Sequence, residues 1–354
     1  MAMLILEDGT RFEGTLFGCR KAVGGEVVFM TGMSGYQELM TDPAYCGQIV
    51  CMTYPLIGNI GVNDLDFESG SAKLSAILVS ELCDMPSNWQ LKTPLEQYME
   101  EQGVVGMHGV DTRALTRHLR KAGVQRGCIV EEEPADAAQL MAAAPAPALA
   151  CTCDQPYEIP GEGGPVVAVL DLGMKRSLTA YLNKKGCTIR VYPASTPAQA
   201  ILDAGCDGVL VSGGPGNPQD YPEITEAVRA LMAARPTLGV DLGHLLMALA
   251  AGAKTERMLY GHHGSNQPVK DLARGTCAVT GQSHLYAVSG DGLPEGVTVS
   301  HINWNDRSIE GLRYAGLQAF SVQFTPAGLG GEFDTTYVFD QFMDMMKKGD
   351  EQNA

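Results

Sequence analysis

From residue 166 onward, short apolar segments alternate with segments whose apolar residues recur every three or four positions. The short segments predict buried strands, and the periodic segments predict helices with one buried face. Strands are expected at 166–170, 188–191, 208–211 and 236–240, and helices at 175–184, 197–204, 225–234 and from 242. This alternation predicts an α/β fold, a doubly wound parallel sheet with helices on both faces.

The pattern before residue 150 is different, because strand-like segments dominate and helical periodicity comes late. Strands are expected at 4–6, 11–16, 26–31, 48–54 and 74–82, a loop at 35–45, and helices at 94–102 and 111–121. The second helix has Arg113, Arg117 and Arg120 along one side, which either face solvent or form an interface. These elements predict a separate N-terminal mixed α/β domain.

The stretch between the two patterns is the candidate linker. Residues 134–149 are rich in alanine and proline, and residues 161–165 read Gly-Glu-Gly-Gly-Pro. Such compositions are typical of flexible connections, and 354 residues favour two domains over one. We therefore expect domains at 1–150 and 165–350, with a linker at 151–164.

Net charge and cysteine use narrow the class of protein. The formal charge of −16 argues against nucleic acid and anionic membranes as partners. No apolar run reaches the roughly 18 residues that span a membrane, and the acidic start lacks a secretory signal, so a cytoplasmic protein is expected. The ten cysteines then predict free thiols. Cys151 and Cys153 have no second pair and no nearby histidine, so no metal site is expected.

Candidate chemistry centres on residues 236–246, where a strand, a sharp turn and a helix follow one another. Gly239-Val-Asp241-Leu-Gly243 has the spacing of a nucleophile elbow, which presents its middle residue at a helix N-terminus. Elbow chemistry needs cysteine or serine there, and this chain has aspartate. The glycine loop 212–218 also follows a strand, so N–H groups of Gly214 and Leu242 could converge on an oxyanion. Both segments lie at carboxyl ends of strands, where ligands bind in such sheets.

Three of these segments carry a family resemblance. The loop Ser-Gly-Gly-Pro-Gly-Asn-Pro at 212–218, the elbow, and Phe-Ser-Val-Gln-Phe-Thr-Pro at 320–326 together resemble class I glutamine amidotransferases. Matching runs at 35–43, 53–59, 110–113 and 261–271 narrow the resemblance to the small subunit of carbamoyl phosphate synthetase. The resemblance covers nearly the whole chain in the same order.

The resemblance implies a fold, a reaction and a partner. It implies a C-terminal doubly wound glutamine amidotransferase-like domain and an N-terminal domain that contacts a large subunit. In this family the small subunit hydrolyses glutamine, and the ammonia passes through a tunnel to the large subunit, where carbamoyl phosphate forms. ATP, bicarbonate and a divalent metal are expected on that large subunit, with no cofactor on this chain. Whether the product serves pyrimidine or arginine biosynthesis stays open.

The resemblance also assigns the catalytic triad of cysteine, histidine and glutamate to three positions. This chain has Asp241, Thr325 and Ala327 there. A carboxylate is a much weaker nucleophile toward an amide than a thiolate, threonine is no base near neutral pH, and alanine orients nothing. His244 belongs to the elbow helix and is not the missing base. An inactive glutaminase site is therefore predicted.

The family's glutamine pocket is altered as well. The resemblance assigns it to Ala44, Gly214, Gly216, Leu242, Leu245, Ser283, Leu285 and Tyr286. A serine has become Ala44, a glutamine has become Leu245, and an Asn-Gly-Phe set has become Ser283, Leu285 and Tyr286. Aliphatic side chains at former polar or glycine positions predict a filled pocket.

Asp241 has a structural interpretation in this account. Aspartate tolerates positive φ better than most residues, and its charge near a helix N-terminus is favoured by about 0.3–1 kcal/mol. Its side chain could cap helix N–H groups or occupy the vacant oxyanion hole. We therefore expect a small subunit with an inactive glutaminase site that supports synthesis from free ammonia. Two alternatives stay open, a non-enzymatic binding or regulatory protein and a glutamine-hydrolysing subunit with an unrecognised catalytic set.

Overall fold

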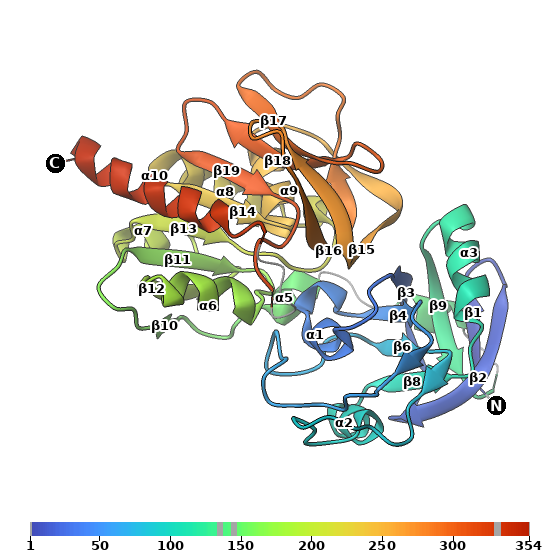
Figure 1. Cartoon of the computed structure of the whole chain (residues 1–354). Helices are drawn as coiled ribbons and strands as arrows, with labels where there is room; N and C mark the ends of the chain where they lie inside the picture. Colours follow the sequence, from blue (N-terminus) through green and yellow to red (C-terminus); the bar gives the residue numbers. More distant parts are fainter. Residues whose placement is uncertain (1, 133–136, 143–146, 329–333, 354) are drawn as a thin grey trace. The chain divides into compact units, whose positions relative to one another are not determined.

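The computed structural model describes residues 2–132, 137–142, 147–328 and 334–353. Within it the chain forms two compact units (Figure 1). The first unit comprises residues 1–145 and 259–264, and the second comprises residues 146–258 and 265–354. Each unit has a hydrophobic core of its own, so each is described by itself.

The first unit is built on a closed barrel. Its strands follow the order β1 (Ala2–Leu6), β2 (Arg11–Gly18), β8 (Val105–His108), β6 (Ala76–Leu78), β4 (Gln48–Met52), β3 (Val23–Met30) and β9 (Gln125–Val130). β1 runs antiparallel to β2 and β9, whereas β3, β4, β6 and β8 pair in parallel. Apolar side chains from these strands fill the interior, as closure of a small barrel requires.

Helices and one short sheet surround this barrel. They are α1 (Tyr36–Thr41), the 3₁₀ turn η1 (Pro43–Tyr45), α2 (Leu95–Gln102), α3 (Thr112–Ala122), α4 (Ala137–Met141), and the pair β5 (Leu56–Ile57) and β7 (Glu81–Leu82). The expected helices at 94–102 and 111–121 are confirmed by α2 and α3. The single strand expected at 74–82 is wrong, because β6 joins the barrel and β7 joins the separate pair.

The loop expected at 35–45 is also wrong, because α1 and η1 occupy it. Its polar residues are buried by specific partners that the sequence pattern does not reveal. The Gln37 side chain donates to the Asn63 carbonyl at 2.7 Å and accepts from the Asn63 N–H at 2.9 Å. Asp42 Oδ1 accepts from the Ala44 N–H at 3.0 Å and so begins η1. The sequence pattern predicted a loop here, whereas paired hydrogen bonds allow these polar residues to be buried in helical turns.

The second unit is a ten-stranded mixed sheet with a parallel centre. The parallel strands are β12 (Thr188–Pro193), β11 (Val166–Asp171), β13 (Gly208–Val211), β14 (Thr237–Val240) and β19 (Ala319–Val322). Beyond β19 the sheet continues through β18 (Ile309–Tyr314), β16 (Cys277–Val288), β15 (Thr255–Asp271) and β17 (Val297–Asn303). The sequence pattern predicted the parallel centre and not this extension.

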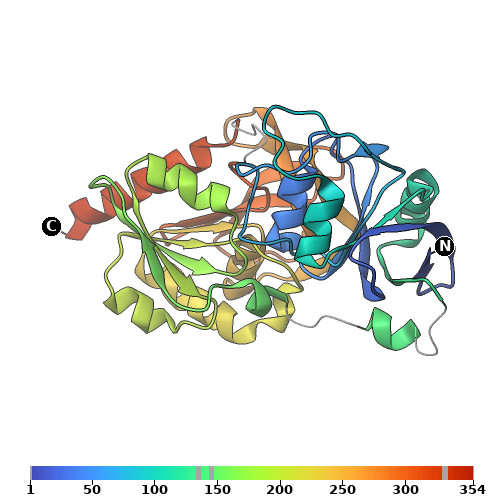
Figure 2. The ribbon, with the colours of Figure 1, turned by 90° about the horizontal axis from the view of Figure 1, so that it is seen from below.

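Helices cover both faces of the sheet, as Figure 2 shows for red α10 and the yellow helices on the opposite side. α6 (Arg176–Lys184) and α10 (Tyr337–Asn353) share one core, and α7 (Ala198–Asp203), α8 (Pro222–Ala234) and α9 (Leu242–Ala250) share the other. The doubly wound α/β class is thereby confirmed. No helix of the described residues is long and apolar enough to cross a bilayer.

The expected linker at 151–164 is not wholly irregular. α5 (Pro147–Cys151) precedes it, and β10 (Tyr157–Ile159) within it pairs antiparallel with β12 at the sheet edge. By contacts the chain divides near residue 145, and residues 259–264 of β15 return to the first unit. In the alanine- and proline-rich stretch, residues 134–136 and 143–146 lie outside the described residues. The ten cysteines are free thiols, as expected.

Gly243 is a position where the fold leaves no space for a side chain. A Cβ built there would lie 2.2 Å from the Val211 carbonyl oxygen, so Gly243→Ala must push α9 away from β13. We expect a loss of about 1–3 kcal/mol in the free energy of unfolding, measured by denaturant titration. Gly290→Ala is the control, because nothing lies within 4 Å of its added Cβ. Equal stability of the two variants would contradict the close approach.

Candidate functional site

Asp241 lies on the sharp turn between β14 and α9, as the sequence predicts. Its φ is 53° and its ψ is −113°, a backbone conformation that residues other than glycine rarely adopt. Neighbouring backbone holds it there: its N–H donates to the Val322 carbonyl at 3.0 Å, and its carbonyl accepts from the His244 N–H at 3.0 Å. The elbow geometry predicted from the sequence is therefore present, with an aspartate as its middle residue.

Residue Asp241 is 6% exposed. Its carboxylate faces the glycine loop and the segment after β19. Oδ1 accepts from Gln323 Nε2 at 3.1 Å, and Oδ2 accepts from the Gly214 N–H in a long bond of 3.4 Å. No side-chain bond caps the N–H groups of α9, so the expected capping role is wrong. The carboxylate instead engages Gly214, one of the two donors predicted for an oxyanion.

Two glycines permit this close approach. A Cβ at Gly213 would lie 2.9 Å from Asp241 Oδ2, and a Cβ at Gly214 would lie 2.1 Å from the Leu172 carbonyl oxygen. Gly216 completes the loop with a φ of 105°. Glycine is required here because the loop packs against both the elbow and the end of β11.

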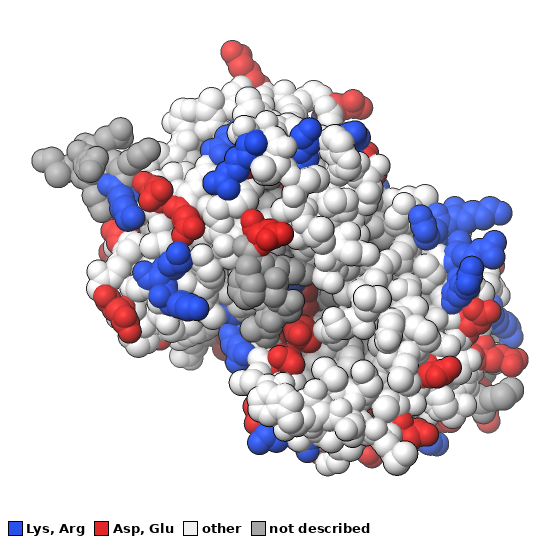
Figure 3. Space-filling model, viewed as in Figure 1, with Lys and Arg blue, Asp and Glu red and all other residues white. Residues whose placement is uncertain are grey.

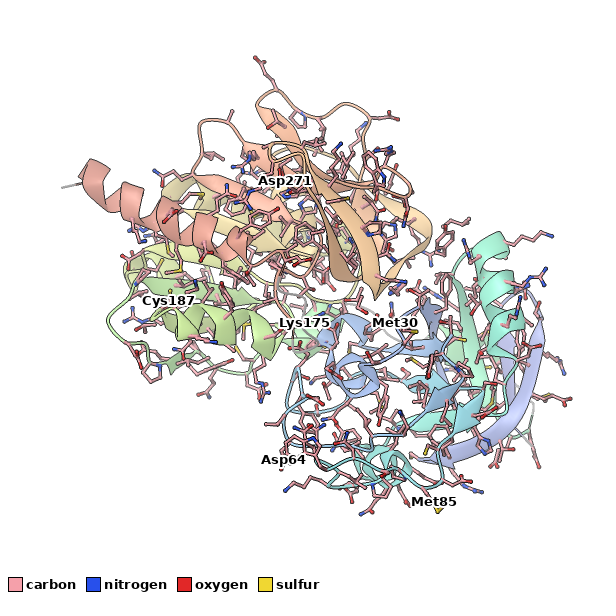
Figure 4. The ribbon with its side chains drawn as sticks, in the orientation of Figure 1. Met30, Asp64, Met85, Lys175, Cys187 and Asp271 are labelled. Atoms are coloured by element: carbon pink, nitrogen blue, oxygen red, sulfur yellow. The ribbon has the colours of Figure 1, made fainter. Side chains whose placement is uncertain are left out.

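The other two triad positions contact the start of α6 and not a catalytic base. Thr325 Oγ1 accepts from Lys175 Nζ at 3.4 Å, and the Ala327 carbonyl accepts from Ser177 Oγ at 3.3 Å. The Thr325 N–H donates to the Gly281 carbonyl at 3.0 Å. Sequence reasoning missed Lys175 and Gln323 as members of this site. Lys175 lies just beyond the carboxyl end of β11 (Figure 4), and this position could have indicated that it belongs to the site.

His244 serves the contact between α9 and the sheet. It is fully buried, and its Nδ1 lies 2.8 Å from Ser321 Oγ, which in turn lies 2.9 Å from the Tyr314 hydroxyl. Burial lowers the pKa of His244 to about 3. Its imidazole is therefore neutral at pH 7 and held by β18 and β19, in agreement with a structural role.

The residues expected in the glutamine pocket fall into two groups. In the second unit, Leu242 and Leu245 belong to the core under α9, and Tyr286 packs against it. Leu285 is 5% exposed and Ser283 is half-buried. Ala44 lies in η1 of the first unit, so no distance connects it with the others. Buried aliphatic groups offer no hydrogen bond to an amide substrate, and a filled pocket stays a prediction.

A second polar cluster lies around Asp271 in the second unit (Figure 4). His301 Nε2 lies 2.8 Å from the Tyr337 hydroxyl, which donates to Asp271 Oδ2 at 3.1 Å. The His301 ring also packs edge-on against Phe324, next to Thr325. Burial lowers the pKa of His301 to about 4, against the opposing effect of Asp271. The three groups line a cavity of about 220 Å³ and join the start of α10 to β15 and β17.

The sheet order, the elbow and the flanking helices define a class I glutamine amidotransferase domain. Residues 168–345 match the family described as glutamine amidotransferase class-I. Residues 4–129 match the CPSase domain of the carbamoyl-phosphate synthase small chain. Among solved structures, a glutamine amidotransferase from Thermotoga maritima has 18% identity and a TM-score of 0.36, covering 53% of this chain and 84% of that one.

Relatives matched over nearly their whole length identify the family more narrowly. The chain is 42% identical over 368 residues to the carbamoyl phosphate synthase small chain of Syntrophotalea carbinolica, with 98% of each chain covered. It is 43% identical over 349 residues to the carbamoyl phosphate synthase pyrimidine-specific small chain of Bacillus subtilis, with 97% of this chain and 95% of that chain covered. The chain belongs to the carbamoyl phosphate synthase small chain family.

The buried histidines of the second unit predict acid sensitivity. The pKa values of His244 and His301 are about 3 and about 4 in the folded chain, against an ordinary value of 6.5. At pH values between the folded and the ordinary pKa, the unfolded chain binds more protons than the folded chain. The contribution of these histidines to stability is therefore full above pH 6.5 and falls as the pH drops toward 4. Denaturant midpoints measured at several pH values should show this fall. His301→Gln removes one titrating group, so an unchanged pH dependence in that variant would contradict the assignment.

Proposed function

We propose that this chain is the small subunit of a carbamoyl phosphate synthetase whose glutaminase site is inactive, and that it supports ammonia-dependent synthesis by a large subunit. One observation carries the proposal. A carboxylate stands at the nucleophile position of an intact elbow and engages the Gly214 N–H, the donor on which glutamine hydrolysis would depend.

Glutamine hydrolysis by this fold needs a nucleophile, a base and an oxyanion donor. Asp241 is a poor nucleophile, and Thr325 is paired with the Lys175 ammonium group at 3.4 Å, not with an imidazole. Loss of the nucleophile alone lowers kcat by about six orders of magnitude in a triad enzyme, and further losses add little. Three changed triad positions therefore support a glutaminase rate near background.

Electrostatics oppose the reaction as well. The tetrahedral intermediate of amide hydrolysis carries negative charge on its oxygen, and an oxyanion hole must stabilise that charge. Here the negative charge of Asp241 already faces the Gly214 N–H and the Gln323 amide. An ionised Asp241 would repel a developing oxyanion strongly in a site with little exposure to water, and the elbow would then disfavour the transition state.

Retention of the whole fold supports a continuing role in a complex. The chain covers 98% of a relative named as a carbamoyl phosphate synthase small chain, and both cores are filled. The differences that the resemblance identifies in chemically important residues lie at the triad and pocket positions. We infer that binding to a large subunit, which would hold ATP, bicarbonate and the divalent metal, is what the chain still does.

One observation favours a second candidate, glutamine hydrolysis by a different catalytic set. Lys175 Nζ lies 3.4 Å from Thr325 Oγ1, and an amine beside a hydroxyl is one known way to activate a nucleophile. This candidate requires an oxyanion donor other than Gly214. A non-enzymatic binding protein that has left the complex is the third candidate, and copurification of a large subunit would separate it from the first.

The decisive experiment measures both reactions. The purified chain should release no glutamate from glutamine above the uncatalysed rate. Mixed with the large subunit, it should support carbamoyl phosphate synthesis from ammonium chloride but not from glutamine. Glutamine turnover that disappears in Thr325→Val would establish the second candidate, and turnover that disappears in Asp241→Ala would establish a carboxylate nucleophile.

Restoring the nucleophile alone should not restore activity. Asp241→Cys still lacks a base at position 325 and an orienting carboxylate at position 327, so its glutamate release should equal that of the unaltered chain. Adding Thr325→His and Ala327→Glu should leave glutamine bound poorly until Leu245→Gln and Leu285→Gly are also introduced. The losses are non-additive, because each missing element blocks the same reaction. Turnover typical of a triad enzyme in the single variant would show that the pocket is intact.

A further inference from the structure

Helix α3 of the first unit exposes a stripe of cations. Arg113, Arg117, Arg120 and Lys121 are exposed, and none of the helix's eleven residues is acidic. The opposite face buries Leu115 and Leu119 in the barrel core. The space-filling view shows a group of basic side chains over this helix, on the right of Figure 3. We call these four basic residues the α3 stripe.

Helix stability does not account for the α3 stripe. Arg113 and Arg117, and Arg117 and Lys121, are four residues apart, where like charges repel. Arg113 lies in the first turn, where the helix dipole disfavours a cation, and only Arg120 and Lys121 lie in the favourable last turn. The side chains of Arg113, Arg117 and Lys121 make no ion pair or hydrogen bond with the described residues, whereas Arg120 Cζ lies 5.8 Å from the Tyr260 ring centre.

The α3 stripe also opposes the charge of the whole chain. The chain has 41 acidic and 25 basic residues, so its net charge is negative. Four cations within eleven residues create a local field of the opposite sign. Such a patch steers an acidic partner toward one orientation, whereas a long polyanion such as nucleic acid would be repelled by the remaining surface. A second copy of this chain carries the same charge of −16 and is disfavoured for the same reason.

We propose that the α3 stripe docks on an acidic surface of the large subunit. The inference rests on the proposed function, in which the resemblance implies a large-subunit contact for the N-terminal domain without naming the surface. The stripe supplies local attraction to an acidic surface in a chain whose net charge is −16. It orients the encounter through Arg113, Arg117 and Lys121, which have no partner among the described residues of the chain.

The test reverses these three charges. Arg113→Glu, Arg117→Glu and Lys121→Glu are combined, and Arg120 is kept because of its contact with Tyr260. Association with immobilised large subunit is measured at low and at high salt. At low salt the association rate constant should fall about tenfold or more, and its salt dependence should weaken. The control combines Lys184→Glu, Lys254→Glu and Lys347→Glu, three exposed cations of the second unit, and should change the rate less than about twofold.

Each outcome is decisive. Both triple variants should keep the unfolding temperature of the unaltered chain, which separates lost docking from lost folding. Equal rates for the unaltered chain and the α3 variant would overturn the inference and leave the proposed function standing. If the unaltered chain does not associate with the large subunit, both the inference and the proposed function are wrong. Salt-dependent self-association, or binding of a duplex oligonucleotide probe, that disappears in the α3 variant would assign the stripe to another occupant and overturn the proposal.

Discussion

The close approach of three backbone segments around the elbow is the constraint on which the second unit depends. The loop after β13, the turn before α9 and the segment after β19 meet where the parallel strands end. Gly213, Gly214 and Gly243 leave no room for a Cβ at this junction. Asp241 accepts hydrogen bonds from the first and third segments while its own backbone holds a positive φ. Strain at the turn persists because packing and hydrogen bonds on every side determine it.

At this junction the fold and the chemistry require different features of the same residues. The elbow exists because the sheet and α9 demand a sharp reversal, whichever side chain occupies the turn. Catalysis adds demands on nucleophile, base and substrate contacts, and the proposed loss of activity assigns the altered residues to those positions. An aspartate suits the turn and can accept the N–H bond that an oxyanion would otherwise receive. The proposed loss of glutaminase activity is therefore compatible with an intact fold.

Buried polar groups hold the rest of the second unit together in pairs and chains. His244 joins α9 to β19 through Ser321, and His301 joins β17 to α10 through Tyr337. Burial keeps both imidazoles neutral by lowering their pKa values, so they act as hydrogen-bonding groups between elements and not as proton carriers. A buried polar group is costly unless it is paired, which explains why these contacts define where each element docks.

The sequence by itself determined the class of the second unit, because short apolar strand segments and the helical period of about 3.6 residues are local properties. It also determined the turn at Asp241, where glycine spacing and a strand-to-helix change coincide. Tertiary structure alone decided the barrel of the first unit, because strand pairing between distant segments leaves no local signal. It also decided the burial of Gln37, whose amide is paired with Asn63. In the site, the family resemblance led to Asp241, Thr325 and Ala327 as triad positions, which stay predictions. It did not predict the contact of Lys175 with Thr325 or that of Gln323 with Asp241. Lys175 is 150 residues from Thr325 and Gln323 is 82 residues from Asp241 along the chain, and only the packing of strand ends brings each pair together.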